Sequence, residues 1–137
     1  MEKRDFLVSI KPGYANLIVE GVKTIELRKK FPSDVEPGTK IIIYASAPVS
    51  MIIGECYIQS VEELNIDDLW NRACIEAMIS WADFKEYFNG HKVGYAIHLK
   101  GHLRYDKPTP LSKHDYLPEK PPQSYCYIES ERMRDLI

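Results

Sequence analysis

The sequence predicts a mainly β domain with helical additions (α+β class), built as a small, partly open barrel of five or six strands. Three observations predict this fold: a series of short apolar runs with strand composition, one early crossover helix, and a helical insertion late in the chain. A doubly wound sheet would require regular alternation of strands and helices, which the pattern lacks. The length of 137 residues predicts a single domain over residues 1–137.

The first elements are a strand and the crossover helix. Residues 6–10 form an apolar run, which predicts a buried strand that ends before Lys11. Pro12 suits the first turn of a helix, because its missing N–H would have no helical partner there. Gly21 suits the left-handed residue that ends a helix. Lys11 is therefore expected at a strand-to-helix junction, beside free backbone N–H groups that favour a phosphate.

The next strand alternates between two kinds of side chain. Ile25 and Leu27 are expected on one face, with Thr24, Glu26 and Arg28 on the other. A carboxylate held beside a guanidinium on a short strand indicates a binding site. The same pattern also fits a solvated edge strand with an ordinary surface ion pair.

Two further strands follow a turn-rich connection. Residues 40–46 are β-branched, as is typical of a central strand, and alternation places Tyr44 and Ser46 on the same face. Residues 51–61 form the next strand. Gly54 inside it predicts a bulge or a close approach of another backbone.

The acidic middle of the chain predicts two helices. Asn65 with Asp68, and Ser80 with Asp83, each have the spacing of an N-terminal cap, and Gly90 is placed to end the second helix. The aromatic residues of this segment recur at helical spacing. We expect most of them to pack against the fold rather than stack on bases.

The last part of the chain returns to strand. Residues 92–100 alternate, and 102–105 can continue that strand. Five prolines predict that residues 106–123 form an ordered, extended loop rather than a helix or inner strand. Residues 124–128 form a closing strand, and a helix is one option for the charged tail at 129–137.

Composition excludes several classes of protein. The 18 basic and 20 acidic residues give a net charge of −2, which does not predict a strongly basic nucleic-acid binder. Three cysteines without C-x-x-C spacing argue against disulfides and zinc, and indicate reduced thiols in a cytoplasmic protein. The four histidines lack metal-binding spacing, and no run is long and apolar enough to span a membrane. We therefore expect no metal, no cofactor and no membrane partner.

Polar side chains from several predicted elements can converge on one site. The candidate ligand-binding residues are Lys11, Lys23, Glu26, Arg28, Tyr44, Ser46, Gln123 and Ser124. Two lysines and an arginine can hold phosphate groups or a carbonyl oxygen. A carboxylate among them can accept an N–H from a base or act as a general base. The set suits recognition of RNA, a nucleotide or a modified nucleoside, without by itself requiring catalysis.

With these residues assembled, the sequence resembles the ASCH domain family of the PUA-like superfamily, from about Phe6 to Ile128. The motifs that carry the resemblance are Ser9-Ile-Lys-Pro12, Gly21-x-Lys-x-x-Glu-x-Arg28, Gly38 with Tyr-Ala-Ser46, Ile53-Gly-Glu55, Tyr95-Ala-Ile97 and Pro122-Gln-Ser124. The resemblance implies a PUA-like β-barrel (pseudobarrel) with a cleft between barrel and helix, lined by the G-x-K-x-x-E-x-R strand. It also implies binding of RNA or nucleotides in processes linked to transcription or translation.

Two branches of the family are enzymes. One hydrolyses the acyl amide of N4-acetylcytidine and uses the lysine of G-x-K with a threonine two residues before the arginine. The matching position here is Glu26 rather than threonine, which argues against that activity. Another branch is similar to metal-independent ribonucleases, for which Lys23, Tyr44 and Ser124 would be suitable residues.

The leading interpretation is a regulatory protein that binds RNA or a nucleotide in a cleft lined by Lys11, Lys23, Glu26 and Arg28. On this view, replacing Lys23 and Arg28 by alanine weakens RNA binding and leaves the melting temperature nearly unchanged. The alternative is a hydrolase acting on RNA or a modified nucleoside, in which Lys23 stabilises an oxyanion and Glu26 is the general base. A third option is a structural domain with a solvated charged face. The oligomeric state stays open.

Overall fold

The computed structural model describes residues 4–130, which form one six-stranded mixed sheet with three α-helices and a short 3-10 helix. The strands are β1 (Arg4–Ile10), β2 (Ile25–Arg28), β3 (Lys40–Ala45), β4 (Met51–Asn65), β5 (Val93–Thr109) and β6 (Tyr125–Glu129). The helices are α1 (Pro12–Val19), α2 (Ile66–Ala73), α3 (Trp81–Tyr87) and η1 (Leu111–Lys113). The predicted class, the early crossover helix and the helical insertion are confirmed, the insertion lying between β4 and β5.

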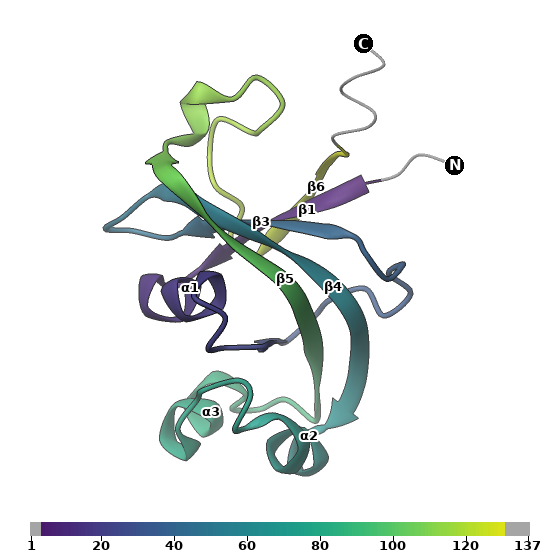
Figure 1. Ribbon diagram of the computed structural model, residues 1–137. Helices are drawn as coiled ribbons and strands as arrows, with labels where there is room; N and C mark the ends of the chain where they lie inside the picture. The colour runs from purple at the N-terminus through teal and green to yellow at the C-terminus, as the bar shows by residue number, and fades with distance from the viewer. Residues whose placement is uncertain (1–3, 131–137) are drawn as a thin grey trace.

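The sheet is curled but does not close into a barrel. Its strand order is β2-β5-β4-β3-β1-β6, so β2 and β6 are the edges. β1 and β3 pair in parallel, joined by the crossover through α1 and β2, and the other neighbours are antiparallel. Figure 1 shows α2 and α3 together at one end of the long β4 and β5 strands. The fold is therefore an open pseudobarrel rather than a closed barrel.

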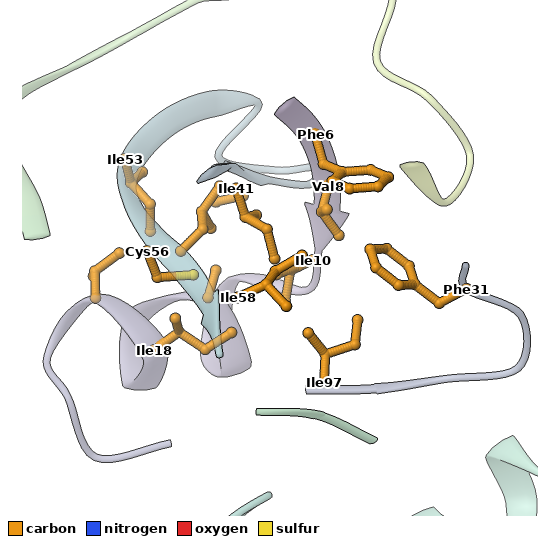
Figure 2. Close-up of a cluster of buried hydrophobic side chains, with 14 residues drawn as sticks. Phe6, Val8, Ile10, Ile18, Phe31, Ile41, Ile53, Cys56, Ile58 and Ile97 are labelled. Atoms are coloured by element: carbon orange, nitrogen blue, oxygen red, sulfur yellow. The ribbon is translucent and has the colours of Figure 1, made fainter. Parts of the chain in front are cut away.

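The largest core cluster lies between the sheet and α1. Figure 2 shows side chains from β1, α1, β4 and β5, together with Phe31, pointing toward one another. Phe6 and Ile58 are essentially inaccessible to solvent there, as is Ile18 of α1. A second cluster joins Leu27 of β2 to α2 and α3. The first cluster holds α1 against the sheet, and the second holds the helical insertion against its edge strand β2.

Local sequence signals explain several element boundaries. Asn65 and Ser80 each accept a hydrogen bond from the backbone N–H three residues later, as predicted for helix N-caps. Gly21 has φ +79°, the left-handed conformation expected at the end of α1. Gly54 lies at a register shift between β4 and β5, and a Cβ there would collide with the Leu103 carbonyl oxygen. The predicted bulge at Gly54 is thus confirmed.

The structure corrects the predicted course of β5. The strand continues beyond residue 105, through Pro108 to Thr109, where a loop was expected. Pro108 is tolerated because it lies in the register shift between the pairs Gly54–Arg104 and Ile52–Thr109, where no regular ladder requires its missing N–H. The predicted tail has its first residue, Glu129, in β6, and residues 131–137 lie outside the described residues.

Candidate active site

A cavity of about 610 Å³ opens beside β2. Its walls come from the junction of β1 and α1, from β2, from the turn after β3, from α3, and from the segment before β6. Six of the eight sequence-predicted site residues line it: Lys11, Lys23, Glu26, Arg28, Ser46 and Gln123. The fold thus brings together polar side chains from positions 11 to 123 of the sequence.

Lys23 is buried although it is a lysine. Lys23 is 3% exposed. Its ammonium donates a hydrogen bond of 2.5 Å to the carbonyl oxygen of Ala77, in the connection between α2 and α3. Burial lowers the pKa of Lys23, and the nearby Glu26 carboxylate partly offsets this effect. The ammonium also lies 5.0 Å from the centre of the Tyr14 ring. Lys23 therefore ties the helical insertion to the start of β2 while lining the cavity.

Glu26 lies between two cations. Its residue is 6% exposed, with Oε1 3.6 Å from Lys23 Nζ and Oε2 3.7 Å from Arg28 Nε. Both distances exceed an ordinary hydrogen bond, so the carboxylate is paired electrostatically rather than saturated by tight donors. The two cations offset the cost of burying the carboxylate, and its lone pairs stay able to accept a hydrogen from a ligand.

Arg28 bridges the two sides of the open sheet. Its Nη2 donates hydrogen bonds of 2.9 Å to the carbonyl oxygens of Ser9 in β1 and Ser124 before β6. Since β2 is the opposite edge from β6, this side chain joins parts of the sheet that no backbone ladder connects. Arg28 Nε is buried, and within residues 4–130 no group accepts its hydrogen.

Lys11 lies at the mouth of the cavity. It is exposed and occupies the N-cap position of α1, where its carbonyl oxygen accepts the N–H of Ala15 at 2.8 Å. Lys11 therefore lies at the positive end of α1, at the strand-to-helix junction that the sequence predicted.

The other two predicted residues, Tyr44 and Ser124, do not line the cavity. Tyr44 is buried in a separate cluster with Ile42 and Leu7. Tyr44 shares its cluster with Ile42, as the alternation predicted, but Ser46 lines the cavity instead, because β3 ends at Ala45 before it. Ser124 takes part through its backbone, since its carbonyl oxygen accepts from Arg28 and from the Ser9 N–H.

Sequence reasoning missed the wall that α3 contributes. The cavity is lined by Asp83, Glu86 and Tyr87 of α3. They are distant from the strand residues in the sequence but line the same cavity. Their spacing of three and four residues places them on one helix face, a signal that could have been recognised. Tyr14 was also missed, although it follows Lys11 by one helical turn. Burial, together with Asp83 and Glu26, raises the pKa of Tyr14.

The charges that line the cavity are balanced. Lys11, Lys23 and Arg28 are basic, whereas Glu26, Asp83 and Glu86 are acidic. Within residues 4–130, no three His, Cys, Asp or Glu side chains are placed to hold a metal ion. Across the same described range, every helix is too short or too polar to cross a membrane.

Comparisons with known proteins show which family the chain resembles. The profile of the ASCH domain matches residues 8–123. An ASCH domain-containing ribonuclease from Zymomonas mobilis subsp. mobilis is 30% identical over 141 residues, covering 99% of this chain and 92% of that protein. The crystal structure of ASCH from Zymomonas mobilis is similar with a TM-score of 0.85 and 28% identity, covering 98% of this chain and 94% of that one.

A more distant likeness concerns the fold alone. The human THYN1 protein, solved in complex with 5-methylcytosine-containing DNA, has a TM-score of 0.54 at 11% identity, over 97% of this chain and 95% of that one. The family resemblance carried by the sequence motifs is confirmed by the match over residues 8–123 and by the similarity to the Zymomonas proteins. The chain belongs to the ASCH domain family.

Proposed function

We propose that this chain binds single-stranded RNA in the cavity beside β2 and cleaves it there. One observation carries the proposal: a buried carboxylate, Glu26, is flanked at 3.6 and 3.7 Å by Lys23 and Arg28 in a cavity large enough for a nucleotide. A general base beside fixed cations is what phosphoryl transfer to a ribose hydroxyl requires. The 30% identity to a protein named as a ribonuclease supports the same reaction class.

The chemistry assigns a role to each of these groups. Glu26 accepts the proton of a ribose 2′-hydroxyl as its oxygen attacks the adjacent phosphorus. The bond from phosphorus to the 5′-oxygen breaks, that oxygen takes a proton from water and leaves as a hydroxyl, and Glu26 returns its own proton to the solvent. The products are a 2′,3′-cyclic phosphate and a 5′-hydroxyl end. Lys23 has three N–H donors, of which Ala77 uses one, so it can stabilise the charge that develops on the phosphoryl oxygens.

The remaining cavity residues hold the substrate in this proposal. Lys11 and the start of α1 bind a phosphate at the cavity mouth, and Ser46 and Gln123 contact the same nucleotide. The regulatory role in transcription or translation that the family resemblance implies would act through this RNA contact. All three cysteines are free thiols, which supports the proposed cytoplasmic location.

Cleavage of a labelled single-stranded RNA, followed on a gel with the product ends identified by mass, tests the proposal. Glu26→Gln should lower the rate by about 10² or more, the usual contribution of a general base. Glu119→Gln, at an exposed position outside the cavity lining, is the matched control. Both variants are assayed at a temperature where circular dichroism shows them folded.

Two outcomes would count against this mechanism. Equal rates for the wild type and Glu26→Gln would exclude Glu26 as the base. Reactions run in EDTA and in magnesium test Lys23 as the charge-stabilising group, because turnover that requires magnesium would contradict that assignment.

A second candidate is hydrolysis of an N4-acylated cytidine. The observation in its favour is the balance of three basic and three acidic side chains around a cavity of about 610 Å³, which suits one nucleoside rather than a polyanion. Release of cytidine from N4-acetylcytidine by the wild type, and its absence with Glu26→Gln, would favour this candidate over RNA cleavage.

A further inference from the structure

We propose that the α3 wall of the cavity selects guanine, with the Glu86 carboxylate binding the Watson–Crick edge of the base. The inference deepens the proposed function and rests on it in placing a nucleotide in this cavity. It concerns a part of the cavity that the cleavage chemistry above does not use.

The cavity has an electrostatic polarity. Its three basic side chains, with Glu26 between two of them, come from the β1–α1 junction and from the chain leading into and along β2, whereas the charged side chains of α3 are both carboxylates, Asp83 and Glu86. A phosphate group is attracted to the basic side and repelled by α3. The buried Arg28 Nε–H, which no group within residues 4–130 accepts, independently points to an acceptor supplied by a ligand on the basic side. A nucleotide bound this way turns its base toward α3.

The two carboxylates of α3 are not equivalent. Asp83 lies close enough to Tyr14 that its carboxylate contributes, after burial, to the raised pKa of Tyr14. Glu86 is exposed, and in the described part of the chain no side chain forms a hydrogen bond or ion pair with its carboxylate. Both of its oxygens are therefore available to accept hydrogen bonds from a base.

Hydrogen-bonding chemistry then distinguishes the four bases. A carboxylate offers two acceptors side by side and no donor. Guanine is the one base whose Watson–Crick edge carries two adjacent N–H donors, N1–H and the N2 amino group. Adenine, cytosine and uracil each place an acceptor beside their donor, and that acceptor would face a carboxylate oxygen. Unpaired RNA bases are commonly recognised on this edge and on an aromatic ring.

Tyr87 supplies the aromatic surface. It lines the cavity one residue after Glu86, and its ring is held by Lys29 Nζ at 4.6 Å and by the Phe88 ring at 4.8 Å between centres. A side chain fixed on these sides loses little freedom when a base packs against it. Glu86 and Tyr87 together thus provide an edge contact and a packing surface for one base.

Binding of the four nucleoside monophosphates, measured by isothermal titration calorimetry, tests this inference separately from cleavage. We expect GMP to bind wild-type protein about tenfold more tightly than AMP, CMP or UMP, the discrimination of one bidentate base contact. Glu86→Gln, which replaces one acceptor by a donor, should remove that preference while leaving AMP, CMP and UMP affinity within about twofold. Glu119→Gln, another exposed glutamate but outside the cavity lining, should retain it.

The inference is overturned if no monophosphate binds, if GMP is not preferred, or if Glu86→Gln retains the preference. The same experiments distinguish failure of this inference from failure of the proposed ribonuclease function. A protein that prefers GMP through Glu86 but leaves RNA uncut supports the base-selecting wall and refutes the ribonuclease. A protein that cuts RNA without a Glu86-dependent preference does the reverse.

Discussion

Replacing Arg28 with alanine should destabilise the fold far more than an ordinary surface arginine does. The substitution removes two charge-assisted hydrogen bonds of 2.9 Å, to the carbonyl oxygens of Ser9 and Ser124, from a side chain that is 11% exposed. Each such bond contributes about 1.5–3 kcal/mol. It also leaves Glu26 with Lys23 as its remaining nearby cation. We therefore expect a loss of about 3–5 kcal/mol in the free energy of unfolding, a large part of the ~5–15 kcal/mol typical of a domain.

Urea-induced unfolding followed by circular dichroism measures this loss. Arg104→Ala is the matched control, because Arg104 also makes two side-chain contacts, to Asn16 and Glu20, but is 45% exposed. That control should cost less than about 1 kcal/mol. Similar urea midpoints for the two variants would show that Arg28 does not join the edges of the sheet. They would instead support the expectation from the sequence that replacing Lys23 and Arg28 by alanine leaves the stability nearly unchanged.

Three further perturbations test other parts of the structure. Glu26→Gln should lower the pKa of Lys23 further, because the Glu26 carboxylate offsets the effect of burial. The 13Cε chemical shift of Lys23, followed by NMR against pH, measures this pKa. An unchanged value would refute the coupling between the two side chains. The unfolding free energy of that variant should then rise with pH up to the ordinary lysine value near 10.5, since the unfolded chain holds the proton more tightly. Tyr105→Phe should lose about 1–2 kcal/mol near neutral pH from its bond to the partly buried Glu55 carboxylate. Because burial raises the pKa of Tyr105, the unfolded chain ionises first and this difference should shrink above pH 10 in urea titrations; a constant difference would contradict the assignment. Gly54→Ala should lower the free energy of unfolding by about 1–3 kcal/mol, because the added Cβ collides with neighbouring backbone. Gly13→Ala is the control: with open space around it, the substitution should be neutral or stabilising by up to ~1 kcal/mol. Equal midpoints in thermal unfolding for the two variants would refute the close approach at Gly54.

The elements that the sequence predicted well depend on local interactions. The caps at Asn65 and Ser80 and the left-handed Gly21 involve residues within one helical turn, so their spacing in the sequence is sufficient. The alternation along β2 is also local. It correctly predicted that Leu27 packs in the apolar cluster with α2 and α3, whereas Glu26 and Arg28 pair with each other.

The features that were missed depend on partners distant in the chain. Ser46 faces the cavity while Tyr44 does not, because β3 ends at Ala45, and the composition of the strand does not reveal where its pairing stops. The α3 wall reaches the cavity because Lys23 and the backbone of Thr24 bind the connection between α2 and α3. In the sequence nothing separates the acidic side chains of α3 from those of a solvated helix face, because the docking depends on Lys23 and Thr24, which are distant in the chain.

Salt-dependent binding of a labelled single-stranded RNA tests most directly whether the cavity is the RNA site. The measurement compares Lys11→Ala, at the cavity mouth, with Lys107→Ala, an equally charged and exposed position on β5 outside the cavity lining. Lys11→Ala should weaken binding several-fold and reduce the slope of log affinity against log salt by about 1, while Lys107→Ala should match the wild type. Equal affinities and equal slopes for the two variants would contradict the proposal that RNA enters this cavity.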